Sequence, residues 1–129
     1  MARLVAAVIA GFVLWSAVWI AAQRVVVSVV PEAFGEDAAV ASTGVLLLFL
    51  AVSVVGSLVS GWVAALVARE SAGRAVPILA AILLGTGLVF EIGGWSLAPA
   101  WYHVLFLLLL VPATLAGARL RAAAKGLDG

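Results

Sequence analysis

The chain has 129 residues, of which 67% are hydrophobic and 10% are charged, and its mean hydropathy is +1.32. Soluble domains have roughly 45–50% apolar and about 25% charged residues, so this composition excludes a water-soluble fold, which would have nowhere to bury so much apolar surface. The net charge of +1 is too small to indicate a nucleic-acid partner, and the lack of cysteine excludes disulfides, thiol catalysis and thiolate metal sites.

Four apolar stretches are each long enough to cross a bilayer, which takes roughly 20 helical residues at about 1.5 Å rise per residue. They cover residues 4–30, 43–68, 75–95 and 99–118. Continuous apolar runs predict helices, because the strands of a membrane barrel alternate apolar and polar residues. The sequence therefore predicts an all-α fold, with a single integral membrane domain over residues 1–129 that forms a bundle of four transmembrane helices.

Turn-forming residues separate the four stretches. The first connection, "VVPEAFGEDAAVAS", contains Pro31, Gly35 and three acidic residues. The second, "ARESAGRAVP", has Gly73 as a predicted helix stop and Pro77 in the predicted first turn of the next helix. Pro112 lies inside the fourth stretch and is expected to bend that helix, because proline has no backbone N–H to donate.

The basic residues indicate an orientation. Six of the seven fall at one end of the predicted bundle: Arg3, Arg69, Arg74, Arg119, Arg121 and Lys125. By the positive-inside rule both termini are then cytoplasmic, and the connections 31–42 and 95–99 are outside. This orientation predicts an outer aromatic belt of Trp95, Trp101 and Tyr102.

Small residues recur at helical spacing along the second stretch. Helices in lipid associate through close packing of small side chains, so we predict a helix-packing seam made of Gly56, Ser60, Gly61, Ala64 and Ala68. Two interpretations remain open. The seam either holds a monomeric bundle together or joins copies of the chain in an oligomer.

Three ionisable residues are predicted to meet near the outer boundary of the membrane. Counting along each helix places Arg24, Glu91 and His103 at a similar height. An ionised group costs about 2.5 kcal/mol or more near the bilayer centre, so Glu91 is expected to be paired or protonated. It is a structural partner of Arg24 or His103, a proton or cation site in a cavity open to the outside, or a side chain that extends to water at the interface.

Other polar residues in the spans suit interhelical hydrogen bonds. Ser16, Gln23 and Thr114 are candidates, and the indole N–H of Trp15 needs an acceptor. No phosphate loop, nucleophile elbow, zinc-protease or calcium-loop pattern occurs. We therefore expect no catalytic residues, no metal site and no cofactor.

The chain resembles a widespread family of small, uncharacterised four-span bacterial inner-membrane proteins. The segments that carry the resemblance are "IAGFVLW" (9–15), "GWVAALVAR" (61–69) and "PAWYHVLFLLLLVPATLAGARLR" (99–121). The resemblance implies an inner-membrane location and the same topology, and it implies no activity.

Three functions are compatible with the sequence. The leading hypothesis is a non-enzymatic membrane protein, a helix-packing or accessory subunit that contacts the lipid bilayer and either itself or a larger membrane complex. The second is a small-solute or ion permease with Glu91 as the coupling carboxylate. The third is a haem- or chromophore-binding subunit that uses His103 as a ligand.

Overall fold

The computed structural model describes residues 2–34 and 43–128, and its long elements are all helices. The four α-helices are α1 (Ala2–Val29), α2 (Thr43–Ala68), α3 (Ala72–Gly93) and α4 (Ala100–Asp128). Three short 3-10 helices lie between them: η1 (Pro31–Ala33), η2 (Arg69–Ser71) and η3 (Trp95–Leu97). The predicted all-α class is confirmed for the described residues. Gly35 and two of the three acidic residues of the first predicted connection, Glu36 and Asp37, lie outside the described residues.

Three helical stretches are long and apolar enough to cross a membrane. They are Ala2–Val29, Thr43–Gly93 and Ala100–Ala124. The second stretch combines α2 and α3, which η2 joins without a gap in the helical structure. Length and composition therefore indicate a membrane-spanning protein. The last helix also continues to Asp128, beyond the predicted end of the fourth stretch.

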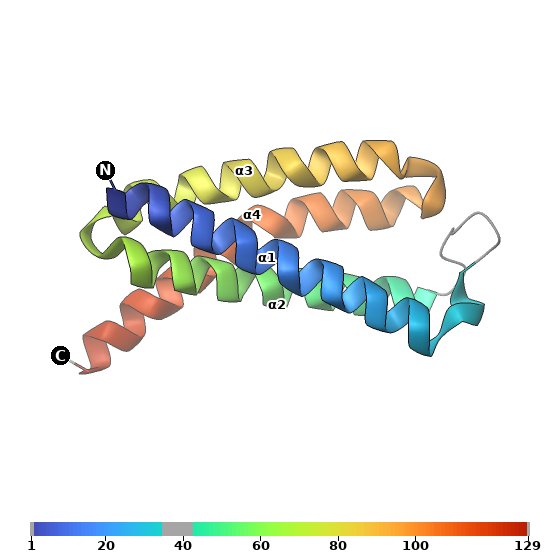
Figure 1. Cartoon of the computed structure of the whole chain (residues 1–129), viewed down its shortest axis with the longest axis horizontal. Coiled ribbons are helices and arrows are strands. Elements are labelled where there is room, and N and C mark those ends of the chain that lie inside the picture. Colours follow the sequence, from blue (N-terminus) through green and yellow to red (C-terminus); the bar gives the residue numbers. More distant parts are fainter. Residues whose placement is uncertain (1, 35–42, 129) are drawn as a thin grey trace.

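The chain reverses direction between α2 and α3, which run side by side (Figure 1). The reversal includes Arg69, whose φ of 53° lies in the left-handed region that non-glycine residues seldom adopt. The prediction that Gly73 stops the second helix is wrong, because Gly73 lies within α3. Pro77 is also further inside α3 than predicted, since that helix begins at Ala72.

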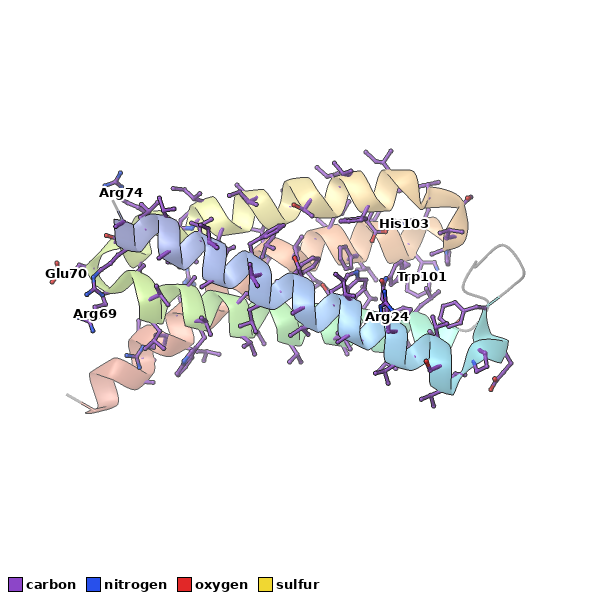
Figure 2. All side chains as sticks on the ribbon, viewed as in Figure 1. Arg24, Arg69, Glu70, Arg74, Trp101 and His103 are labelled. Carbon is purple, nitrogen blue, oxygen red and sulfur yellow. The ribbon has the colours of Figure 1, made fainter. Side chains whose placement is uncertain are left out.

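Helices α2 and α3 each contact the other three helices, and the contacts of α2 with α4 and α1 are the most extensive in the bundle. The start of α1 and the end of α4 lie at the same end of the molecule, and α4 changes direction along its length (Figure 1). Proline is the usual cause of such a bend, and Pro112 lies inside α4. Figure 2 shows Arg69 and Arg74 at the end that holds the termini, and Arg24 and His103 in the opposite half.

The closest approach of two helices is between α2 and α4. A Cβ placed on Gly61 would lie 1.9 Å from the backbone oxygen of Thr114, and one on Gly117 would lie 2.0 Å from the backbone oxygen of Leu58. Two glycines, one on each helix, therefore let the two backbones touch. The geometry aims each glycine Cα–H at a carbonyl oxygen, a weak hydrogen bond that recurs at close helix contacts.

All five residues of the predicted seam are buried within the single chain. Gly56 faces Val18 and Trp15 of α1, while Gly61 faces α4. The hydroxyl of Ser60 donates a hydrogen bond of 2.9 Å to the backbone oxygen of Gly11 on α1. The seam thus serves contacts inside the bundle, which favours the monomeric interpretation of this stripe over the intermolecular one.

Candidate functional site

The candidate site is built around the turn between α3 and α4. Glu91 lies in the last turn of α3 and His103 in the first turns of α4, with η3 between them. Both are buried, with 7% of Glu91 and 2% of His103 exposed. The Nδ1 atom of His103 pairs directly with the Oε2 atom of Glu91. The predicted pairing of Glu91 with His103 is therefore present.

The second ring nitrogen of His103 is also occupied. Its Nε2 atom lies 2.9 Å from the backbone oxygen of Trp95 and 3.2 Å from that of Ala98. A carbonyl oxygen only accepts hydrogen bonds, so Nε2 carries a proton and donates it to this turn. With both nitrogens engaged, the imidazole has no lone pair left for a metal. This geometry argues against His103 as a haem or chromophore ligand.

The pair carries no net charge. Because Nε2 is protonated, a single further proton lies between Nδ1 and the Glu91 carboxylate. If it is on the imidazole the two groups form an ion pair, and if it is on the carboxyl group both are neutral. The net charge of the pair is zero in each case, which lowers the free-energy cost of placing two ionisable groups in an apolar bundle.

Aromatic rings hold the imidazole in place. The Trp95 ring stacks on it with centroids 4.5 Å apart and an interplanar angle of 19°. Tyr102 meets it edge-on, with centroids 5.7 Å apart. His103 therefore joins the end of α3, the η3 turn and the start of α4, and its position is set by the rings of Trp95 and Tyr102 and by partners at both nitrogens.

Arg24 is not part of this cluster. Figure 2 places it in the same half of the bundle as His103, as the sequence predicted. Its side chain is exposed, however, and among the described residues no hydrogen bond or ion pair joins it to Glu91 or His103. The expected meeting of three groups is thus corrected to a pair. The arginine side chain is long enough to carry its guanidinium group to water at the membrane boundary.

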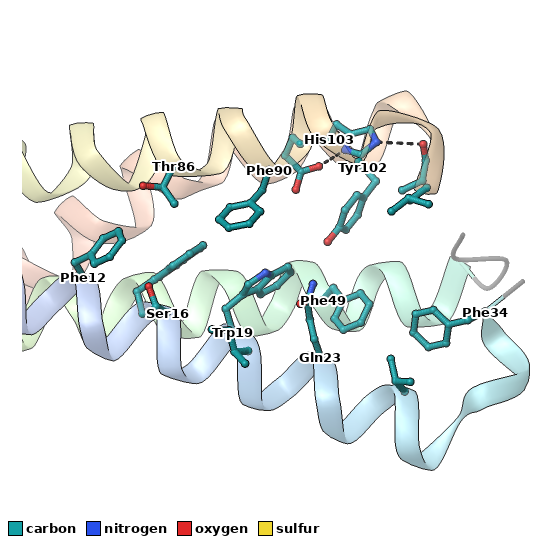
Figure 3. A pocket seen from close by; sticks show the side chains of 17 residues that line it. Phe12, Ser16, Trp19, Gln23, Phe34, Phe49, Thr86, Phe90, Tyr102 and His103 are labelled. Atoms are coloured by element: carbon teal, nitrogen blue, oxygen red, sulfur yellow. Dashed lines mark hydrogen bonds and ion pairs between the residues drawn. The ribbon is translucent and has the colours of Figure 1, made fainter. Parts of the chain in front are cut away.

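A pocket of about 590 Å³ lies beside the pair. It is enclosed by α1 on one side and by α3, η3 and the start of α4 on the other, with Phe49 of α2 also in its wall (Figure 3). Glu91 and His103 are among the lining residues. Seven of the other lining residues are aromatic: Phe12, Trp15, Trp19, Phe34, Phe49, Phe90 and Tyr102.

A few polar groups interrupt this aromatic wall. They are the side chains of Ser16 and Gln23 on α1, Thr86 on α3 and Tyr102 on α4. The Tyr102 hydroxyl is directed into the pocket (Figure 3), and no hydrogen bond from it to another described residue is present. Tyr102 is 6% exposed, so its predicted place in an outer aromatic belt is wrong, whereas Trp95 and Trp101 are exposed.

The other polar side chains in the spans differ in their partners. The indole N–H of Trp15 donates to the hydroxyl of Ser57 at 3.2 Å, which joins α1 to α2. The Thr114 hydroxyl donates to the backbone oxygen of Leu110 at 2.9 Å, within its own helix rather than between helices as predicted. Ser53 is buried, and its hydroxyl has no hydrogen-bond partner within the described part of the chain.

The pocket was not identified from the sequence, although a signal for it is present. Phe12, Ser16, Trp19, Gln23 and Val27 follow one another at intervals of three or four residues, so they share one face of α1. This face combines large rings with hydrogen-bonding groups. In a membrane helix such a stripe marks a side that faces protein or a cavity rather than lipid.

Comparison with family models, with curated proteins and with solved structures gives no match. The functional interpretation therefore depends on the geometry of this chain.

Proposed function

We propose that the chain is a non-catalytic protein of the bacterial inner membrane that crosses it four times, with both termini in the cytoplasm. It acts as a helix-packing or accessory subunit, through contacts with further copies of itself or with a larger membrane complex. Four crossings are supported by the lengths of α2 and α3, which have 26 and 22 residues. Each is long enough to span roughly 30 Å of hydrocarbon, and the two are antiparallel.

The orientation is supported by the charges at the end that holds the termini. Arg69 and Arg74 lie there (Figure 2), and the guanidinium of Arg121 lies 5.9 Å from the centre of the Trp62 ring. Basic residues at one end of a bundle are typical of the cytoplasmic face, whereas tryptophan occurs at both membrane interfaces. The opposite end holds exposed Trp95 and Trp101.

The use of polar side chains inside the bundle carries the proposal of a non-catalytic role. Three contacts join a polar side chain to another helix: Glu91 with His103, Trp15 with Ser57, and Ser60 with Gly11. The Thr114 hydroxyl bonds to Leu110 of its own helix. Catalysis by acid, base or nucleophile needs a group that is free to meet a substrate. Here the acid and base candidates that line the pocket, Glu91 and His103, are engaged with each other and join α3 to α4.

A permease is the second candidate, and one observation favours it. Glu91 lines the pocket as well as pairing with His103. A coupling carboxylate in a transporter would have such access to a cavity. Against this function, the carboxylate is already engaged, and the pocket wall is mainly apolar rather than a continuous polar path.

Gentle extraction of the tagged chain from its native membrane, combined with flux measurements, tests the proposal. We expect the chain to elute with further copies or with other membrane proteins in a constant ratio. Glu91→Gln should reduce stability in detergent without changing proton or solute flux in proteoliposomes. Recovery as a lone monomer, together with a pH-driven uptake that Glu91→Gln abolishes, would contradict the proposal and favour the permease.

A further inference from the structure

The pocket opens sideways, between α1 and α3. These helices touch near Gly11 and Leu79, where a Cβ on the glycine would meet the leucine side chain at 2.4 Å. Towards the opposite end of the bundle they diverge (Figure 1). Lining residues on both helices are exposed there, with Ile20 at 52% on α1 and Phe90 at 68% on α3. The mouth of the pocket therefore faces the surroundings of the bundle, which are lipid in a membrane.

The wall of the pocket favours an uncharged ligand. Among the described residues no lysine or arginine lines it, and the one acid and one histidine in its wall neutralise each other. A charged molecule in this space would lack an opposite charge and would lose its hydration. An entrance from lipid also selects molecules that are soluble in the membrane.

The aromatic wall favours a flat ring with polar edges. The side chains of Phe12, Trp19 and Phe90 project into the same space from α1 and α3 (Figure 3). Aromatic side chains bind flat rings by offset stacking or edge contacts. Tyr102 and Gln23 supply hydroxyl and amide donors at the wall, and such donors pair with carbonyl or ether oxygens.

We propose that this pocket binds a neutral, membrane-soluble molecule with an aromatic or quinone ring, which enters between α1 and α3. Its ring lies among the aromatic side chains, its oxygens accept hydrogen bonds from Tyr102 and Gln23, and an apolar tail extends into the lipid. The volume of about 590 Å³ is within the range of roughly 300–1,000 Å³ found for small-molecule sites. The inference is independent of the proposed accessory role.

Tryptophan fluorescence of the purified chain in lipid nanodiscs gives a direct test, with menadione as the quinone probe. Trp15 and Trp19 line the pocket, so a quinone bound there quenches their emission. We expect quenching that saturates. Bilayer lipid is present in excess and competes for the pocket. Saturable quenching in its presence therefore means that the pocket prefers the ring to an acyl chain.

Two substitutions on α1 form a matched pair for this assay. Ser16→Phe places a ring in the pocket and should weaken menadione binding at least tenfold. Val13→Phe adds the same ring on the same helix at a position that is 58% exposed and outside the pocket wall, so binding should be unchanged. Tyr102→Phe keeps the ring and removes the hydroxyl, and should weaken binding about fivefold.

Three results would overturn the inference. One is quenching that rises in proportion to menadione without saturation and equally in all variants, which means partition into lipid. Another is saturable binding that Ser16→Phe leaves intact, which places the probe elsewhere. The third is stronger binding of the cation tetraphenylphosphonium than of menadione, which identifies a site for hydrophobic cations. None of these results bears on whether the chain co-purifies with partners, so the two proposals fail separately.

Discussion

The imidazole of His103 on α4 pairs with the carboxylate of Glu91 on α3, while its other nitrogen donates to the backbone of the turn between the two helices. One side chain thus closes the α3–α4 hairpin at three points. The apolar surroundings make each of these contacts stronger than it would be in water, and make the loss of any partner more damaging.

Two substitutions of Glu91 remove its charge, but only one of them keeps a hydrogen bond to His103. Glu91→Gln keeps a donor for Nδ1 of a neutral imidazole, so we expect a loss of about 1–2 kcal/mol in the free energy of unfolding. Glu91→Leu leaves Nδ1 without a partner in the apolar bundle, and should cost about 3 kcal/mol or more. Equilibrium unfolding in mixed detergent and SDS measures both. Equal stability of the leucine and glutamine variants would contradict the pairing.

Arg24 provides the contrasting case at the same level of the bundle. Its side chain is exposed and makes no described contact with Glu91 or His103. Arg24→Gln should therefore change the free energy of unfolding by no more than about 0.5 kcal/mol. The same unfolding assay serves as the measurement. A loss as large as that of Glu91→Leu would restore the three-residue cluster that the sequence suggested.

The close contact of α2 and α4 should be intolerant of a single methyl group. Gly61→Ala places a carbon 1.9 Å from the Thr114 oxygen, so the helices must separate, and we expect a loss of about 2–3 kcal/mol. Gly85→Ala is the matched control, because a Cβ there meets nothing within 4 Å. It should be neutral or stabilise the helix by up to about 1 kcal/mol. The fraction of protein that stays folded after heating, measured by size-exclusion chromatography, compares the two variants. A similar loss for both would show that the close approach of α2 and α4 does not determine stability.

The all-α class and the approximate limits of the helices follow from hydropathy and from the turn-forming residues, because the length of an apolar run is a local property. The burial of Gly61 and the pairing of Glu91 were also accessible, since small residues and lone carboxylates in lipid need protein neighbours. The direction of Tyr102 was not. Its position beside Trp101 suggested a belt, and only the path of α4 decides which of two adjacent rings points inward.

The turn after α2 shows a second limit of local reasoning. Gly73 is the residue type that ends helices, yet the positive φ is at Arg69, four residues earlier. Packing of α3 against α2 fixes where the chain must reverse, and this tertiary demand overrides the local preference for glycine. The pocket was missed for a related reason, because a cavity depends on how far α1 diverges from α3, which no single segment encodes.

Two serines one turn apart on α2 should respond in opposite ways to the same change. Ser57 accepts a hydrogen bond from the Trp15 indole, so Ser57→Ala leaves a buried donor unpaired and should cost about 1–2 kcal/mol. Ser53 is equally buried, but its hydroxyl has no partner within the described residues.

Removal of an unpaired hydroxyl eliminates a desolvated polar group, so Ser53→Ala should be neutral or stabilise the bundle by up to about 1 kcal/mol. Unfolding in SDS measures both variants, and the shift of the Trp15 emission maximum should accompany only Ser57→Ala. Destabilisation of the Ser53 variant to the same degree would mean that its hydroxyl bonds to a partner outside the described residues. The sign of the difference between these two variants therefore tests the hydrogen bond between α1 and α2 while the size of the substitution stays constant.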